Sequence, residues 1–501
     1  MSTVFQAFFG DSLDTDRPLI LGANPKTYGE VRQTCEHLIE VLGQHGCRPG
    51  ERVGIALDQG EAYLASLLAV RKAGCVAVLL FPHWTAFELD YVLDHAAIRV
   101  VISSAAKMGS RKAVCETALS DLGCKVQSFD GIRATESDLA EGVIIYTSGT
   151  TGKPKGVVLS EAAVSANARA VARYLDLGPD DQSPVFTPSC YALSLSQNLA
   201  AVAVGAALYP VETGLRFPSD IMTALSREKL NGLTGDQTSL SLLMQTGVAA
   251  KLDFSHVRYV STGGRPLHED FVAKLNAVFP NAALINFYGC SENSPRISYF
   301  YLDGDKAKGR DQNGYYAVGK PVEGSDFRVG DEHGNALAEG ETGEIWITGT
   351  SLMSGYLNDP ENTRKRLLDG WFRTQDIGYI DENQDLHVTG RLSNIINVAH
   401  LKVSPEEVEM VLMGSDSIEE VAAYGVDDPL LGSVVHAAVV LREDAELDEA
   451  ALQAHCRRML SPQKVPQAFF RIDAVPKNLY GKIDRKALMK AIAPLYETAG
   501  G

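Results

Sequence analysis

The chain has 501 residues, enough for about three domains at roughly 150 residues each. Apolar residues make up 45% and charged residues 22%, the balance of an ordinary globular protein. The 46 basic and 63 acidic residues give a net charge of −17, which disfavours nucleic acid and anionic lipid surfaces as partners. The apolar runs are too short to span a bilayer, and the N-terminus lacks the features of a signal peptide. We therefore expect a cytoplasmic protein that is not inserted in a membrane.

The eight cysteines are scattered along the chain and form no C-x-x-C pair. This spacing supports neither a zinc site nor a disulfide framework in a protein with so large a core. We expect buried free thiols.

The first half of the chain alternates strand patterns with helix patterns. The β-rich runs at 52–58 and 99–104 predict strands, and the pattern at 61–74 predicts a helix between them. Two further predicted strands, at 141–146 and 281–286, each deliver the chain into a polar loop. Alternation of this kind predicts an α/β sheet.

Two features follow in the second half of the chain. The stretch "GEIWITG" at 343–349 alternates with a period of two and predicts an antiparallel strand with one face in water. Further on, Ser404 is a predicted helix N-cap, Pro405 is the first helical residue, and Glu407 completes a capping box.

The pattern of predicted elements changes after residues 390–391. A strand pattern at 435–441, a helix at 448–460 and a final strand near 468–473 make a compact α+β unit. We therefore predict two domains: a large N-terminal α/β domain with mixed sheets over residues 1–390, and a small α+β lid over residues 391–501.

The loop "YTSGTTGKPKGV" at 146–157 combines glycines, hydroxyls and lysines directly after a predicted strand. Glycines let backbone N–H groups approach an anion, hydroxyls donate hydrogen bonds, and a lysine adds charge. The loop therefore predicts a phosphate site, with a mobile surface loop as the alternative. Its spacing does not fit the G-x-x-x-x-G-K-[ST] pattern of P-loop nucleotide-binding proteins.

This loop closely resembles the signature of the acyl-adenylating superfamily, which holds acyl-CoA synthetases, nonribosomal-peptide adenylation domains and luciferases. Six further stretches match the family's motifs in the same order along most of the chain: "STGGRPL", "FYGCSE", "GEIWITG...GYLNDPENT", "GWFRTQDIGYID", "GRLSNIINV" and "VPKNLYGKIDRKAL".

The resemblance implies that ATP and Mg²⁺ are used to activate a small or medium carboxylic acid as an acyl-adenylate, with release of pyrophosphate. The acyl group would then pass to the thiol of CoA or of the phosphopantetheine on a separate carrier protein. The implied catalytic residues are Lys482, Glu292 and Thr147, with Glu292 as the Mg²⁺ ligand. The implied nucleotide-binding residues are Thr147, Ser148, Gly149, Thr150, Thr151, Lys155, Gly263, Gly264, Tyr288, Gly289, Ser291, Asp376 and Arg391. The resemblance implies that Thr147, Ser148, Thr150, Thr151 and Lys155 bind the phosphates. It also implies that "STGGRPL" and Tyr288 lie beside the adenine and that Asp376 binds the ribose hydroxyls.

The sequence departs from the family pattern at four positions: Gln375 replaces a Gly, Ser291 replaces the commoner Thr, Ser393 stands at the hinge, and His400 replaces a Gly. The Gly at the last position permits close approach of the acceptor thiol in the family. His400 therefore leaves open whether the acceptor is a thiol, an amine or another nucleophile.

The acid pocket that the resemblance implies contains Tyr191, Ser194, Asp236, Cys290 and Ser294. Amino-acid-activating relatives carry an Asp where this chain has Ala192, so an α-amino acid is disfavoured. Asp236 can be interpreted in two ways. It could pair with the amine of a β-amino acid, or it could cap the helix predicted to follow it.

One rival from another class is a nucleotide-binding regulatory protein that has lost its chemistry. The presence of Lys155, Glu292, Asp376 and Lys482 argues against this rival.

Overall fold

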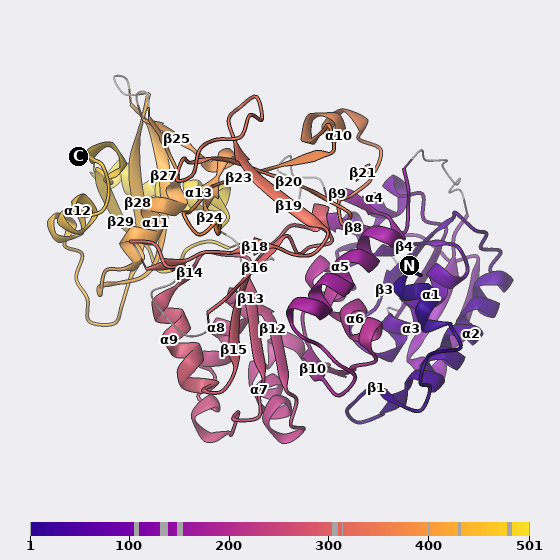
Figure 1. Cartoon of the computed structure of the whole chain (residues 1–501). Coiled ribbons are helices and arrows are strands. Elements are labelled where there is room, and N and C mark those ends of the chain that lie inside the picture. Colours follow the sequence, from indigo (N-terminus) through magenta and orange to yellow (C-terminus); the bar gives the residue numbers. More distant parts are fainter. Residues whose placement is uncertain are drawn as a thin grey trace. The chain divides into compact units, whose positions relative to one another are not determined.

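The computed structural model describes residues 2–104, 110–130, 139–147, 154–302, 309–312, 314–398, 401–428, 432–477 and 483–499 (Figure 1). The chain forms two compact units. The first comprises residues 1–308, 318–327 and 347–373, and the second comprises residues 309–317, 328–346 and 374–501. The predicted domain boundary at 390–391 falls inside the second unit, and the start of a lid at that point stays a prediction.

An eight-stranded sheet of the first unit carries the strand that leads into the glycine-rich loop. Its strand order is β21-β9-β8-β4-β3-β5-β7-β6, and the inner pairs β8/β4, β4/β3 and β3/β5 are parallel. The bounds are β3 (Arg52–Ala56), β4 (Val76–Leu79), β5 (Val100–Ser103), β6 (Cys115–Leu119), β7 (Cys124–Ser128), β8 (Val143–Thr147), β9 (Lys155–Leu159) and β21 (Gly355–Tyr356). The connecting helices are α2 (Tyr28–Gln44), α3 (Glu61–Lys72) and α4 (Ala86–His95).

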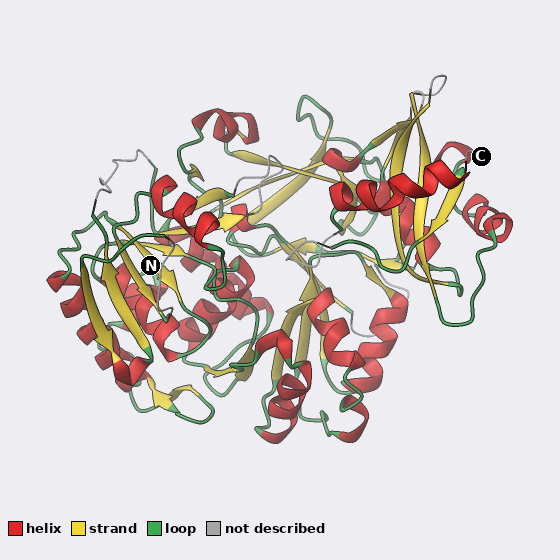
Figure 2. Cartoon of the chain, turned by 180° about the vertical axis from the view of Figure 1, so that it is seen from behind, coloured by secondary structure: helices red, strands yellow, loops and turns green. Residues whose placement is uncertain are grey.

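A five-stranded sheet, in the order β12-β13-β15-β16-β18, carries the strand that ends at Tyr288. Strands β12, β13 and β15 are parallel, so their carboxyl ends lie together at one edge. The bounds are β12 (Gly232–Asp236), β13 (Tyr259–Gly263), β15 (Ala283–Tyr288), β16 (Ser298–Tyr301) and β18 (Lys320–Pro321). Figure 2 shows this sheet in yellow between red helices, which include α7 (Pro218–Arg227), α8 (Gln237–Gln245) and α9 (Glu269–Val278).

A four-stranded sheet and two packed helices complete the first unit. The sheet has the order β10-β11-β1-β2, with β1 (Pro18–Ile20), β2 (Lys26–Thr27), β10 (Gln182–Val185) and β11 (Ala207–Pro210). The helices α5 (Glu161–Tyr174) and α6 (Ala192–Val204) pack against each other (Figure 1). The short helices are α1 (Val4–Phe8) and α10 (Pro360–Arg366).

The strands β19 (Ser325–Gly330), β20 (Gly343–Gly349) and β23 (Trp371–Ile380) each contain residues of both units. They belong to a sheet of order β19-β20-β23-β22, with β22 (Leu367–Leu368) at its edge and β24 (Leu386–Arg391) paired with β23. The remaining strands that precede the C-terminal sheet in the chain are β14 (Leu267–His268) and β17 (Tyr315–Tyr316).

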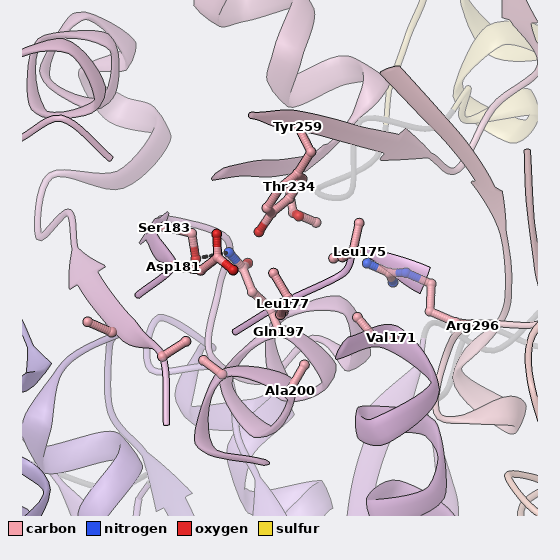
Figure 3. Close-up of a pocket in the computed structure, with 13 residues that line it drawn as sticks. Val171, Leu175, Leu177, Asp181, Ser183, Gln197, Ala200, Thr234, Tyr259 and Arg296 are labelled. Carbon is pink, nitrogen blue, oxygen red and sulfur yellow. Dashed lines mark hydrogen bonds between the residues drawn. The ribbon is translucent and has the colours of Figure 1, made fainter. Parts of the chain in front are cut away.

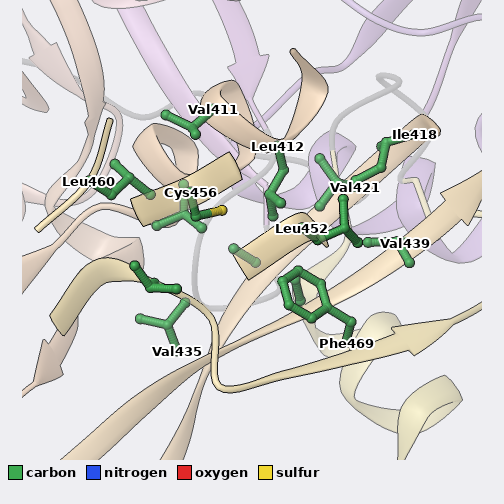
Figure 4. Packing of buried hydrophobic residues seen from close by; sticks show 14 of the residues in the cluster. Val411, Leu412, Ile418, Val421, Val435, Val439, Leu452, Cys456, Leu460 and Phe469 are labelled. Atoms are coloured by element: carbon green, nitrogen blue, oxygen red, sulfur yellow. The ribbon is translucent and has the colours of Figure 1, made fainter. Parts of the chain in front are cut away.

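The C-terminal sheet of the second unit has the order β26-β25-β28-β27, with β29 paired to β28. A core of aliphatic side chains and Phe469 packs between this sheet and helices α11 and α12 (Figure 4). The bounds are β25 (Ile396–Val398), β26 (Leu401–Val403), α11 (Pro405–Met413), β27 (Ile418–Asp428), β28 (Gly432–Leu441), α12 (Glu449–Arg457), β29 (Ala468–Arg471) and α13 (Arg485–Ala499).

These elements confirm the predicted mixed α/β fold, and three local predictions need correction. Strand β20 buries four successive residues, 344–347, so it has no alternating wet face. Ser404 caps α11 as predicted, but the Glu407 carboxylate accepts from the Lys464 ammonium at 2.6 Å and completes no capping box. All eight cysteines lie in the described residues and none forms a disulfide, yet Cys115 is exposed.

Candidate active site

The Glu292 carboxylate lies in a short turn just after β15 and is held by a tyrosine from β21. The Tyr356 hydroxyl donates a hydrogen bond to a Glu292 carboxylate oxygen at 2.8 Å. Tyr356 is 4% exposed, and burial, with a further contribution from the Glu292 charge, raises its pKa. Tyr356 is therefore a hydrogen-bond donor at neutral pH, and it fixes the direction in which the half-buried carboxylate points.

The same tyrosine contacts a predicted phosphate-binding lysine. The Lys155 ammonium lies 5.6 Å from the centre of the Tyr356 ring. The backbone pairing explains this contact, because β21 pairs with β9 and sets Tyr356 opposite Val157, two residues beyond Lys155. A carboxylate and an ammonium thus both contact one buried tyrosine. Sequence reasoning missed Tyr356, although "GYLNDPENT" contains it.

The two ends of the glycine-rich loop meet in a hairpin. Strands β8 and β9 are antiparallel, and Thr147 pairs with Lys155 across the closing rung. At the base of the hairpin, His95 Nδ1 lies 2.7 Å from the Tyr146 hydroxyl. Four predicted nucleotide-binding residues between these ends lie outside the described residues: Ser148, Gly149, Thr150 and Thr151.

The predicted adenine-side residues lie at the carboxyl ends of β13 and β15. Gly263 pairs with Phe287, and a Cβ on Gly263 would lie 2.3 Å from the Phe287 carbonyl oxygen. A Cβ on Gly289 would lie 1.4 Å from the Pro295 carbonyl oxygen. Gly264 has a φ of +87°. The backbone and ring of Phe287 and the backbone of Pro295 therefore occupy the space that a side chain would need at Gly263 and Gly289, so close packing within the protein requires glycine at these two positions.

The predicted ribose ligand Asp376 is buried and paired with Arg391 within the second unit. The Arg391 Nε donates to the Asp376 carboxylate at 2.6 Å, and the two residues face each other across β23 and β24. The preceding residue Gln375 has a φ of +62°, and its N–H donates to the Glu344 carboxylate at 3.1 Å. The left-handed backbone explains why a Gly is the easier residue at position 375.

The predicted acid-pocket residues lie at the start of α6, at the end of β12 and in the turn after Tyr288. Tyr191 is the N-cap residue of α6, and the buried Ser194 hydroxyl accepts from the Gln59 side-chain amide. Ser294 is buried and its hydroxyl donates to the Ser351 carbonyl at 2.8 Å. Cys290 is half-buried.

Asp236 is the N-cap of α8. Its carboxylate accepts from the Ser239 backbone N–H at 3.0 Å and from the Ser239 hydroxyl at 2.8 Å. The capping interpretation of this residue is thereby confirmed. Ser291 lies in the same short turn as Glu292.

The chemistry of this arrangement fits a phosphate-bound cation better than a cage of protein ligands. No group of three or more His, Cys, Asp or Glu side chains with metal-binding geometry occurs among the described residues. Mg²⁺ often takes only one or two protein carboxylates, the rest of its shell being phosphate oxygens and water. Glu292 alone suits that pattern. Lys482 and His400 lie outside the described residues, so their placement stays a prediction.

Comparison with known proteins places the chain in a family. The profile described as AMP-binding enzyme matches residues 14–357, and that of the AMP-binding enzyme C-terminal domain matches residues 407–482. The chain is 28% identical to a feruloyl-CoA synthase of Amycolatopsis sp over 467 residues, which cover 92% of this chain and 93% of the relative. It is 28% identical to a sulfoacetate–CoA ligase of Cupriavidus necator, with 95% and 94% covered.

A solved structure agrees with these sequence matches. The amide bond synthetase McbA from Marinactinospora thermotolerans superposes with a TM-score of 0.82 at 26% identity, covering 97% of this chain and 99% of that one. In the described part of this chain, no helix is both long and apolar enough to cross a membrane. The protein is an acyl-CoA synthetase-like ligase and belongs to the AMP-binding enzyme family, the acyl-adenylating superfamily that its motifs resemble.

Proposed function

We propose that this enzyme activates a small or medium carboxylic acid with ATP and Mg²⁺, and then passes the acyl group to a thiol. In the first step a carboxylate oxygen attacks the α-phosphorus of ATP. The bond from the α-phosphorus to the bridging oxygen breaks, and pyrophosphate leaves with that electron pair. In the second step the thiol sulfur attacks the acyl carbon, AMP leaves, and the thiol proton passes to solvent.

The observation that carries this proposal is the arrangement of Glu292, Tyr356 and Lys155. Two anions must meet in the first step, so charge neutralisation and positioning are the main tasks of the protein. A Mg²⁺ ion bound beside Glu292 would supply positive charge to the phosphates. Lys155 would add a second positive charge from the hairpin, and the Tyr356 hydroxyl would hold the carboxylate in place.

The remaining roles come from the family resemblance and complete the proposal. Asp376 would bind the ribose hydroxyls, held in place by Arg391. Lys482, in the proposed lid of residues 391–501, would stabilise charge that develops between the acid and the α-phosphate. We propose CoA or a separate carrier protein as the acceptor and the cytoplasm as the location.

The test is pyrophosphate release from ATP with a panel of plain, aryl and hydroxy acids, measured with and without Mg²⁺ and CoA. We expect release that depends on acid and on Mg²⁺, with thioester formed when CoA is present. Absence of pyrophosphate release with every acid would overturn the proposal. Release of pyrophosphate without thioester would support the adenylation step and exclude CoA as the acceptor.

A second candidate, transfer to an amine, is favoured by one specific finding. The structural neighbour McbA is described as an amide bond synthetase, and the chain matches 99% of its length. His400, which replaces a Gly of the family pattern, could serve as a general base for an amine. Preformed acyl-adenylate should be offered separately to CoA, a carrier protein and simple amines. If an amine is the acceptor, His400→Gly should form adenylate but lose transfer.

If the acceptor is a thiol, His400→Gly should leave thioester formation unchanged or speed it.

A third candidate, activation of a β-amino acid, rests on pairing between Asp236 and the substrate amine. The capping bonds of Asp236 to Ser239 weaken that candidate, because both carboxylate oxygens already accept hydrogen bonds.

A further inference from the structure

The hollow beside Arg296 in the first unit is too small to bind a substrate (Figure 3). It lies between helices α5 and α6 and strands β10 and β12, and it has room for about one water molecule. Polar side chains such as Gln197 and Thr234 line it, so it suits a bound water and marks no second ligand site.

The second unit contains a better connected feature around the predicted catalytic lysine. The lysine segment, residues 478–482, contains Lys482 and lies outside the described residues. Its flanking residues Lys477 and Ile483 form an antiparallel bridge, and the Asp484 N–H donates to the Pro476 carbonyl at 2.8 Å. The two flanks are thus fixed to each other. The groups that hold these flanks therefore set where the lysine segment starts and ends.

Helices α11 and α13, which lie on either side of the lysine segment in the sequence, pack on opposite faces of the C-terminal sheet. Ala423 of β27 belongs to the core that includes α11 residues, whereas its neighbours Ala422 and Tyr424 belong to the core that includes α13 residues. Strand β27 lies at the edge of this sheet. A side chain at the start of α13 can therefore reach α11 past that edge.

Arg485, the first residue of α13, makes this connection. Its guanidinium donates to the Glu406 carboxylate at 3.1 Å and to the Glu409 carboxylate at 3.0 Å, both on α11. It also donates to the Ala423 carbonyl of β27, and the Ala423 N–H donates to Glu409 at 2.9 Å. The side chains of Arg485, Glu406 and Glu409 are 23%, 20% and 13% exposed. Water therefore screens these charged bonds little, and they are strong and directional.

The ionic contact on the other flank of the lysine segment is weaker. Lys477 forms an ion pair with Glu420 of β27, but each of the two side chains is 35% exposed. An exposed ion pair contributes little, because water and salt screen it. Of the two flanks, the one that carries Arg485 is therefore held by the stronger ionic contacts.

Glu406 also holds the turn at the predicted hinge. The Asn394 side-chain amide, in the turn Leu392–Asn394, donates to the same Glu406 oxygen that accepts from Arg485. The Ser404 hydroxyl donates to the other Glu406 oxygen at 2.9 Å. One carboxylate thus joins the hinge turn to the start of α13.

We propose that the Arg485 guanidinium positions Lys482 for adenylation, and that Glu406 holds this guanidinium in place. The proposal rests on the proposed role of Lys482 in adenylation. Lys482 precedes Arg485 by three residues, and a displacement of about 1 Å can slow a reaction by about 10²-fold. That role concerns charge that develops at the α-phosphate, so it belongs to the first step. Loosening Arg485 should therefore slow adenylation and leave transfer from the acyl-adenylate unchanged.

Glu406→Gln tests the inference with a side chain of the same shape. It keeps an oxygen for Asn394 and Arg485 and removes the negative charge, so the domain should still fold. We expect pyrophosphate release to slow about tenfold, and transfer from preformed acyl-adenylate to CoA or a simple amine to stay within about twofold. An equal loss of both steps would leave only a structural role for this carboxylate and would overturn the inference.

The matched control is Glu407→Gln, at the next position of α11. The Glu407 carboxylate pairs with the Lys464 ammonium at 2.6 Å, and the side chains are 30% and 23% exposed. This ion pair has similar burial and makes no printed contact with the flanks of the lysine segment. Both steps should stay within about twofold of wild type. A loss of adenylation as large as that in Glu406→Gln would overturn the inference.

Combination with Lys482→Ala shows whether the effect acts through the lysine. Arg485→Lys keeps the charge and loses the forked geometry of the guanidinium. We expect it to slow pyrophosphate release about tenfold or more in the wild-type background and less than about twofold in the Lys482→Ala background. The same fold-loss in both backgrounds would show that Arg485 acts independently of Lys482 and would overturn the inference.

Hydrogen exchange of the Asp484 amide separates failure of this inference from failure of the proposed function, because it requires no chemistry. We expect Arg485→Lys and Glu406→Gln to speed exchange of this amide, and Glu407→Gln to leave it unchanged. Faster exchange supports the inference even where no acid yields pyrophosphate, an outcome that rejects the proposed function alone. Unchanged exchange in both variants, together with acid-dependent pyrophosphate release by the wild type, supports adenylation and overturns the inference.

Discussion

The bond between Tyr356 and Glu292 can be removed with little change in packing. Tyr356→Phe deletes the hydroxyl that donates to the Glu292 carboxylate at 2.8 Å and keeps the buried ring. The ring contact with the Lys155 ammonium is kept as well. The substitution therefore isolates the orientation of one carboxylate from the shape of the site.

The size of the effect follows from the charge and burial of the acceptor. A hydrogen bond to a charged group contributes about 1.5–3 kcal/mol. Glu292 is half-buried, so water can replace part of that bond, and we expect the free energy of unfolding to fall by only about 1 kcal/mol. Groups that orient a metal ligand change metal affinity by about 10- to 100-fold when they are removed.

The assay is pyrophosphate release at saturating ATP and acid, titrated with Mg²⁺. We expect Tyr356→Phe to raise the half-saturating Mg²⁺ concentration about tenfold or more, with kcat at saturating Mg²⁺ within about threefold of wild type. The matched control is Tyr63→Phe, since the buried Tyr63 hydroxyl has no partner among the described residues. An unchanged Mg²⁺ titration in Tyr356→Phe would refute the role given to this bond and weaken the assignment of Glu292 to the metal.

Four further outcomes are expected. Lys482→Ala should lower adenylate formation by about 10²-fold or more with ATP binding retained, as measured by pyrophosphate release and calorimetry; release at the wild-type rate would remove Lys482 from the catalytic residues. Gln375→Gly should raise the free energy of unfolding by about 0.5–1 kcal/mol in urea denaturation, because position 375 has a φ of +62°; a loss of stability would contradict this account. Asp236→Ala should cost about 1 kcal/mol of stability and lower activity equally for acids with and without an amine, whereas a selective loss with amino acids would restore the pairing interpretation. Burial lowers the pKa of His95 in the folded state, so the free energy of unfolding of the wild type should fall as pH drops below about 6.5, where the unfolded histidine binds a proton first. His95→Gln should reduce the difference between the free energies of unfolding measured in urea at about pH 7.5 and about pH 5.5. An unchanged difference would show that other groups cause the pH dependence.

The sequence alone could predict those features that depend on neighbouring residues. Short β-rich runs located the strands β3, β5, β8 and β15, and a helical pattern located α3 between the first two. The N-cap at Ser404 followed from a serine before a proline at the start of a helix. Each of these signals lies within one element and its flanks, so the final packing of the chain changes them little.

Features that depend on distant pairings could not be predicted in this way. The Glu292 carboxylate and Tyr356 are 64 positions apart, and Arg296 and Tyr174 are 122 positions apart. The position of Tyr356, for example, follows from the strand order that sets β21 beside β9. Burial likewise depends on both faces of a sheet, which is why the alternating pattern of β20 gave a wrong prediction of one wet face.

Asp236 shows the limit of motif reasoning in another way. A carboxylate at the end of a predicted strand, close to a presumed substrate, fits both a substrate ligand and a helix cap. The bonds to the Ser239 N–H and hydroxyl establish the helix cap, and pairing of Asp236 with a substrate amine stays a prediction. The residue type is the same in both interpretations, so the cap could be established only from the geometry of the helix start.

The departure from the family pattern at position 375 acts on the stability of the fold. Gln375 stands where the backbone turns left-handed, but its N–H is held by the Glu344 carboxylate and its neighbour Asp376 is held by Arg391. The bonds on both sides thus hold the backbone at position 375 in its left-handed conformation. We therefore expect the strain to lower the free energy of unfolding and not to weaken nucleotide binding.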